Sequence, residues 1–216
     1  LFLIAAFLIS CASPDSTQEP ENKKPSTRPV FRVQEKKQTQ TKGEKNQWEY
    51  IVKVSPNLHE YTINFIGKGT ENFLNINKIE IFRLEDSNPI QVIDSLETLT
   101  PIINGNILFV MEDVNFDNYN DLRVVSRSSL SSLPFLYFLF IPETGLFKRN
   151  VEYERITSPQ VDFADKEIVS FKKNDQNSYV TEFYEIKNNS PVLVKKVVKA
   201  FTQENLLQVT TYELIN

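Results

Sequence analysis

The side chains best suited to chemistry lie in nine residues near the middle of the chain. Residues 113–121 read Asp-Val-Asn-Phe-Asp-Asn-Tyr-Asn-Asp. Oxygen-bearing side chains stand at positions one, three, five and nine of this segment, and a main-chain carbonyl falls at position seven, as in calcium loops. Because Ca²⁺ prefers hard oxygen ligands, the spacing predicts a weak calcium site. The predicted ligands are the side chains of Asp113, Asn115, Asp117 and Asp121 and the carbonyl of Tyr119.

A second interpretation of this segment involves no metal. Asn118 stands at position six, where calcium loops usually have Gly, and Val124 stands at position twelve, where an EF-hand has Glu. Asn is the residue that next best tolerates the positive φ required there. An Asx-rich turn, held by bonds from side chains to the main chain, explains the same residues. Strand-like runs at 107–111 and 122–125 flank the segment and predict a β-hairpin around it.

Short runs of alternating apolar and polar residues dominate the chain from Trp48 onward. In residues 60–65, Tyr61, Ile63 and Phe65 fall on one face, which is the period of a half-buried strand. Similar runs occur at 49–54, 78–84, 89–93, 178–186, 192–198 and 206–215. Continuous apolar runs at 107–111 and 133–141 predict central strands.

Turn-forming residues separate these runs. They lie at 104–106 (Asn-Gly-Asn), 142–145 (Pro-Glu-Thr-Gly) and 188–191 (Asn-Asn-Ser-Pro). No long helical period is evident. The pattern therefore predicts an all-β fold, namely an antiparallel β-sandwich or a partly closed barrel built from hairpins.

The start of the chain indicates export. Residues 1–9 are wholly apolar, and nine helical residues rise only about 14 Å. That length is too short for the roughly 30 Å bilayer core but is typical of the apolar region of a signal peptide. With no initiator Met or basic residues before it, the segment 1–10 is interpreted as a partial signal peptide.

Residues 8–11, Leu-Ile-Ser-Cys, resemble the lipobox of bacterial lipoproteins. The resemblance implies cleavage before Cys11 and attachment of fatty acyl chains such as palmitate to it. Two or three acyl chains hold a protein on a membrane stably. Cys11 is the only cysteine, so the sequence predicts a lipid anchor and no disulfide.

Composition divides the rest of the chain. Residues 11–47 are rich in Pro, Ser, Thr, Gln, Lys and Glu, which predicts a disordered tether with a reach of roughly 30 Å. Residues 48–216 form the predicted all-β domain. Eight of the 24 basic and five of the 28 acidic side chains lie before residue 48, which leaves 16 basic and 23 acidic, a net charge of −7, for the domain. This charge argues against nucleic acid as a partner.

Nothing in the sequence favours an enzyme. The chain has one His and no cysteine beyond Cys11, which disfavours zinc and Cys–His sites. Neither a G-x-S-x-G turn nor a Gly-rich phosphate loop occurs. The prediction is a non-enzymatic protein.

Residues 113–122 also resemble the D-x-N-F-D-G-Y-x-D-L motif of a family of exported bacterial domains, and the resemblance continues through 137–147 and 156–162. Relatives in that family are all-β and similar to periplasmic inhibitors of invertebrate-type lysozyme and to immunity proteins against peptidoglycan hydrolases. In such inhibitors a Gly- and Ser-containing loop with a nearby Tyr plugs the hydrolase cleft. Here the matching stretch, 126–134, keeps the serines and lacks Gly. The resemblance implies binding by Ser128, Ser129, Ser131 and Tyr137.

Together these features predict a binding module attached to the bacterial cell envelope, on its periplasmic face or outer surface, by lipidated Cys11. Its predicted partners are the membrane and a lysozyme or peptidoglycan hydrolase, with calcium bracing the hairpin. The alternative is a structural or host-facing surface lipoprotein without a hydrolase target.

Overall fold

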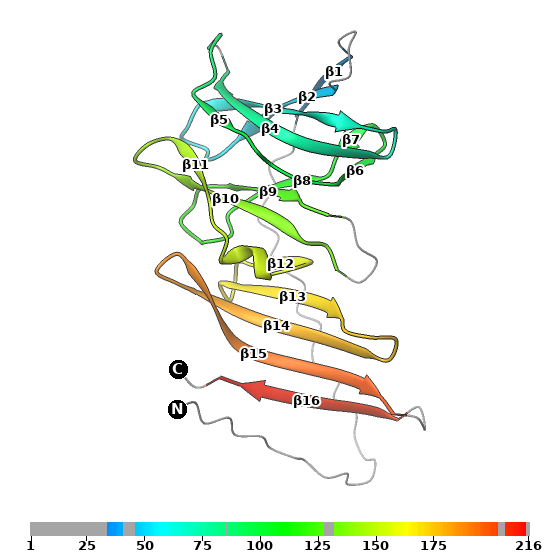
Figure 1. The fold of residues 1–216 in the computed structure, drawn as a ribbon. Coiled ribbons are helices and arrows are strands. Elements are labelled where there is room, and N and C mark those ends of the chain that lie inside the picture. The colour runs from blue at the N-terminus through cyan, green and yellow to red at the C-terminus, as the bar shows by residue number, and fades with distance from the viewer. Residues whose placement is uncertain (1–33, 41–45, 85, 128–131, 203–205, 215–216) are drawn as a thin grey trace. The chain divides into compact units, whose positions relative to one another are not determined.

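The described part of the chain falls into two compact units. The computed structural model describes residues 34–40, 46–84, 86–127, 132–202 and 206–214, with the backbone alone for 34–40 and 46 (Figure 1). The units divide between Thr157 and Ser158, and each is treated by itself below. The predicted signal peptide, Cys11 and most of the tether lie outside the described residues. Within the described ranges, no helix has the length and apolar character needed to cross a membrane.

The first unit contains two antiparallel sheets. The larger sheet has the strand order β1-β2-β3-β4-β6-β7, with β5 paired to β4. Its strands are β1 (Gln34–Gln40), β2 (Asn46–Lys53), β3 (Glu60–Gly69), β4 (Phe73–Arg83), β5 (Gln91–Ile93), β6 (Thr100–Ile103) and β7 (Asn106–Ile107). The smaller sheet has the order β11-β10-β9-β8. Its strands are β8 (Phe109–Glu112), β9 (Asp121–Val125), β10 (Phe135–Ile141) and β11 (Leu146–Arg149), followed by the 3₁₀ turn η1 (Tyr153–Arg155).

The two sheets share one apolar core. Alternate residues of β2, β3 and β4 form a buried cluster with residues of β9, β10 and β11. In β3 the buried apolar side chains are Tyr61, Ile63 and Phe65, as the alternation predicts. The fold class predicted from the sequence is therefore confirmed, and of its two forms the structure shows the sandwich.

The central strands only partly match the prediction from apolar runs. Strand β10 lies inside its sheet and is buried on both faces, as a continuous apolar run predicts. The run 107–111 does not form one central strand. The chain passes there from the larger sheet, at Ile107, to β8 at the edge of the smaller sheet. Apolar residues are needed at such a crossing because both sheets bury it.

The predicted turns are confirmed. Asn104 and Gly105 have φ of 52° and 81° and join β6 to β7. Asn188 and Asn189 have φ of 51° and 60° and join β14 (Ser178–Lys187) to β15 (Ser190–Phe201). Two successive residues with positive φ match the twist of an antiparallel hairpin, and Asn and Gly tolerate that conformation best.

The second unit is one antiparallel sheet in which strand order follows sequence order. Its strands are β12 (Pro159–Asp162), β13 (Glu167–Lys173), β14 (Ser178–Lys187), β15 (Ser190–Phe201) and β16 (Leu207–Glu213). The alternating runs predicted at 178–186, 192–198 and 206–215 correspond to the last three strands.

Two features differ from the domain boundaries predicted from composition. Residues 34–40, assigned to the disordered tether, form β1 and pair antiparallel with β2. Main-chain hydrogen bonds to an exposed strand do not require apolar side chains, so polar composition did not indicate this strand. The range 48–216, treated as one domain, spans both units.

A buried carboxylate joins three side chains of the second unit. Glu182 of β14 accepts hydrogen bonds from Lys172 Nζ at 2.6 Å and from the Tyr184 hydroxyl at 2.8 Å, and Lys196 Nζ lies 3.8 Å away. Burial acts to raise the pKa of Glu182, but the bonds from Lys172 and Tyr184 outweigh it and hold the pKa below its usual value. The charged form of Glu182 therefore stabilises the folded state.

Glu182→Gln should lower the free energy of unfolding by about 1–3 kcal/mol at neutral pH, because a buried charged partner is lost. A group with a lowered folded pKa contributes stability above its unfolded pKa and loses it as pH falls through the folded pKa. Urea unfolding should therefore show that the variant has a lower free energy of unfolding than the parent at pH 7, and that this deficit disappears at low pH.

Glu185→Gln is the matched control, because Glu185 pairs at 3.2 Å with Lys187 and both side chains are about half exposed, at 46% and 51%. Such a pair contributes little. A Glu182→Gln deficit that stays equal across the pH range would contradict the role of the charge.

Candidate functional site

The segment 113–121, called the Asp loop below, connects β8 to β9. Glu112 and Asp121 pair across the hairpin, as the flanking strand runs predict. Phe116 and Asn118 have φ of 62° and 73°, so position six does need the conformation that Asn tolerates.

The carboxylates of the Asp loop accept hydrogen bonds from the main chain. Asp113 Oδ1 accepts from Asp117 N at 3.0 Å, and Asp113 Oδ2 accepts from Asn118 N at 2.8 Å. Asp117 Oδ1 accepts from Tyr119 N at 2.9 Å, and the Asn115 amide donates to Asp117 Oδ2 at 2.8 Å. These are the bonds of an Asx-rich turn, the metal-free interpretation.

Asp121 ties the loop to the neighbouring strand. Its Oδ2 accepts from Val114 N at 3.0 Å and its Oδ1 accepts from Phe140 N of β10 at 2.8 Å. Burial holds the pKa of Asp121 well above its usual value, and the charges of Asp117 and Asp113 add to the rise. Burial likewise raises the pKa of Asp113. Burial therefore disfavours the charged form of both carboxylates.

The far end of the loop reaches the larger sheet. Asn120 N donates to Val54 O at 2.7 Å, and the Asn120 side chain donates to Lys53 O at 3.1 Å. The Tyr119 ring stacks on Phe140, with centroids 5.6 Å apart. The Asp loop therefore links the end of β2 to β10 and positions the two sheets of the first unit.

Calcium stays a prediction for this loop. Its oxygen-rich side chains suit Ca²⁺, but among the described residues no three His, Cys, Asp or Glu side chains converge as a metal site. Asp113 and Asp121 point at main-chain N–H groups instead. Binding of an ion would require these carboxylates to turn toward it.

Of the four residues that the resemblance implies for binding, one lies in the described part of the chain. Ser128, Ser129 and Ser131 lie outside the described residues. Tyr137 is fully buried in β10, its hydroxyl donates to Ile156 O at 3.0 Å, and burial raises its pKa to about 12. Its assignment as a binding residue needs correction, because a side chain packed under η1 cannot reach a partner.

Tyr137 belongs instead to a buried cluster around a cation. Arg123 of β9 forms an ion pair with Glu112 and lies 5.2 Å from the Phe135 ring centroid and 5.9 Å from that of Tyr137. The Tyr153 ring of η1 packs 5.6 Å from Tyr137. The cluster seals the second face of the smaller sheet, so its role is structural.

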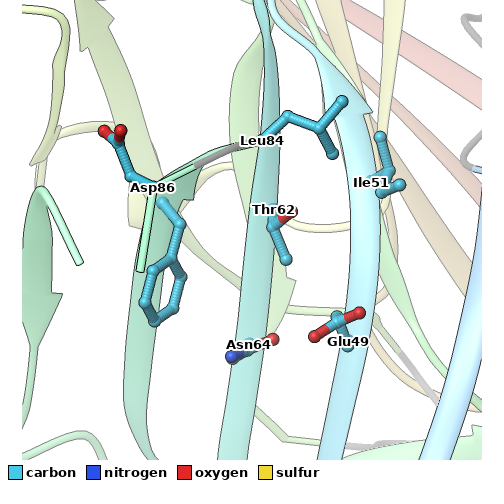
Figure 2. A pocket seen from close by; sticks show the side chains of 7 residues that line it. Glu49, Ile51, Thr62, Asn64, Leu84 and Asp86 are labelled. Carbon is cyan, nitrogen blue, oxygen red and sulfur yellow. The ribbon is translucent and has the colours of Figure 1, made fainter. Parts of the chain in front are cut away.

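An open hollow that was not predicted from the sequence lies on the outer face of the larger sheet, the face turned away from the core (Figure 2). The hollow has a volume of about 240 Å³ and is called the outer-face hollow below. Its lining residues are Glu49, Ile51, Thr62, Asn64, Phe82, Leu84 and Asp86. In an alternating strand, polar residues on the outward face predict only that this face is in contact with water. The sequence therefore does not indicate where a hollow forms on it.

Strand register builds the hollow. Glu49 of β2 is paired with Asn64 of β3, and Thr62 is paired with Ile51 on one side and Phe82 on the other. Figure 2 shows Asn64 and Glu49 side by side at one end of the hollow. Polar groups at that end and apolar walls beside it give a surface suited to an amphipathic side chain.

Comparison with known proteins gives one likeness in fold. No protein-family model and no curated protein matches the sequence. A solved structure, that of a Xanthomonas type IV secretion system related protein, is similar, with a TM-score of 0.58 and 11% sequence identity. The alignment covers 84% of this chain and 98% of that chain. At this identity the likeness shows a shared fold.

Asp117→Asn tests the state of the Asp loop. In chelator, this variant should melt close to the parent temperature, because two effects oppose each other. Asn keeps an oxygen for the Tyr119 N–H and removes repulsion toward Asp113 and Asp121, but it loses the oxygen that accepts the Asn115 amide. The calcium prediction is that millimolar Ca²⁺ raises the Tm of the parent, and raises that of Asp117→Asn less, because Asn offers an oxygen ligand without the negative charge. A parent Tm that does not change between calcium and chelator would rule out the calcium site.

Proposed function

We propose that this chain is a non-catalytic binding module of the bacterial cell envelope. The observation that carries the proposal is the shared fold, over 84% of this chain, with a protein related to a type IV secretion system. Secretion systems cross the envelope, and the predicted signal peptide and lipobox would route this chain to the same compartment.

The Asp loop supports a role as a rigid scaffold. Its carboxylates hold main-chain groups, and it links β2 to β10. Binding surfaces built on a rigid sandwich lose little conformational entropy when a partner docks.

The proposed target is a cationic protein, namely a lysozyme or another peptidoglycan hydrolase. A net charge of −7 for residues 48–216 would speed the encounter with such an enzyme and would make it depend on salt. The resemblance of residues 113–122 to an inhibitor-like family points to the same class.

The purified chain should inhibit at least one enzyme in a panel of lysozyme types and peptidoglycan hydrolases, assayed by loss of turbidity of a peptidoglycan suspension. Inhibition should weaken between low salt and about 0.5 M salt, because surface charges are screened beyond roughly 10 Å already at 0.1 M. If every enzyme in the panel retains full activity, the hydrolase target is wrong.

The serine stretch offers a matched pair for that assay. Replacing Ser128, Ser129 and Ser131 by Arg should weaken inhibition if this stretch enters the cleft. Replacing Asn174, Gln176 and Asn177 by Arg, at exposed positions of the second unit, adds the same charge and should weaken inhibition less. Equal inhibition by both variants would assign the contact to another surface.

The anchor has its own test. In a bacterial host, Cys11→Ser should move the chain from the membrane fraction to the soluble envelope fraction, because stable attachment needs the acyl chains. Immunoblotting of the fractions, with metabolic labelling by palmitate, measures both the location and the modification. Retention of Cys11→Ser on membranes would contradict lipid anchoring.

A further inference from the structure

The outer-face hollow contains a buried acceptor without a donor. Asn64 lies at an outward-facing position of β3, yet it is only 6% exposed because neighbouring side chains surround it. Its Oδ1 atom has no hydrogen-bond partner. A buried polar atom without a hydrogen bond lowers the stability of the folded protein. A ligand that donates a hydrogen bond to Asn64 Oδ1 would remove this loss.

The charge around Asn64 selects a cationic donor. Asn64 has two cross-strand neighbours, Glu49 of β2 and Glu80 of β4, and Glu80 forms an ion pair with Lys78. Glu49 and Asp86 line the hollow. Among the described residues that line it, none is Lys, Arg or His. A positively charged N–H donor would satisfy Asn64 and neutralise Glu49 together.

The walls and the size select a side chain with an apolar stem. Ile51, Phe82 and Leu84 are the apolar part of the lining, and Leu84 is 43% exposed. The volume of about 240 Å³ lies below the roughly 300–1,000 Å³ of pockets for drug-sized ligands. A small hydrated cation would leave these walls uncovered, whereas the methylene stem of a long basic side chain would cover them.

We propose that the outer-face hollow binds the guanidinium group of an arginine side chain on the surface of a protein partner. Guanidinium is planar and carries several N–H donors, so one group can bond the Glu49 carboxylate and also Asn64 Oδ1, once the side chains that cover this atom move aside. Its stem would lie beside the Phe82 ring. The ammonium of lysine is a more strongly hydrated point charge and fits two acceptors less well. This inference names one contact of the binding role proposed above and rests on that role for the partner.

The test uses a small probe, so it does not depend on the partner. The full chain, labelled with ¹⁵N, is titrated with Nα-acetyl-arginine amide and separately with Nα-acetyl-citrulline amide, an uncharged isostere. The arginine probe should give saturable shifts of the amide signals of Glu49, Asn64 and Phe82 in the millimolar range. The citrulline probe should bind at least about tenfold more weakly, since it lacks the charge. Absence of saturable shifts, or equal shifts with both probes, would overturn the proposal.

Variants locate the contact. Asn64→Leu and Glu49→Gln should each weaken binding of the arginine probe at least about tenfold, whereas Glu60→Gln should not. Glu60 belongs to the same strand as Asn64 and lies outside the hollow, so it is the matched control. Glu49→Gln changes one partly exposed side chain on the surface, which keeps the test valid even if Asn64→Leu fails to fold. Undiminished binding by Glu49→Gln would refute the site.

The two proposals fail in different ways. Probe binding together with an unaffected hydrolase panel would leave the arginine site standing and remove the hydrolase target. Inhibition of a hydrolase without binding of the arginine probe would support the hydrolase target and refute the arginine site.

Discussion

The first unit depends on one buried carboxylate, that of Asp121. Its two oxygens accept the N–H groups of Val114 and Phe140, so a single side chain closes the Asp loop and joins it to β10. Burying a charge is costly unless hydrogen bonds compensate it, and the raised pKa of Asp121 is the sign of that cost. The same loop then holds the end of β2 through Asn120. The arrangement of both sheets, and of any surface they carry, follows from these bonds.

The strands were predictable where one face is apolar and the other polar. Tyr61, Ile63 and Phe65 mark the inner face of β3 by alternation alone. Turn geometry was equally predictable, because Asn at 118 and at 188–189 is one of the few residues that adopt positive φ without large strain. Local sequence suffices for such features because the physical cause is local.

Features that arise from pairing between distant segments were not predictable. Strand β1 exists because β2 offers main-chain groups, whatever the polar composition of 34–40. The apolar run 133–141 predicts that Tyr137 is buried, but it does not reveal that the Tyr153 ring of η1 packs against it. From the sequence alone, Asn64 is expected to face water. Its side chain is buried because Glu49 lies opposite it in the neighbouring strand and other side chains surround it. The candidate site lies among features of this kind.

The strand order of the second unit bears on how fast the protein folds. Each of its strands pairs only with its neighbours along the chain, so every pairing closes a short loop and the sheet is able to zip up from any hairpin. The sandwich instead must bring together Leu99 and Arg127, and β4 and β6, across longer stretches. Rates of folding fall as contacts become less local. We therefore expect the sandwich of the first unit to fold more slowly than the sheet of β12 to β16. That sheet would then form first, at the carboxyl end of the chain.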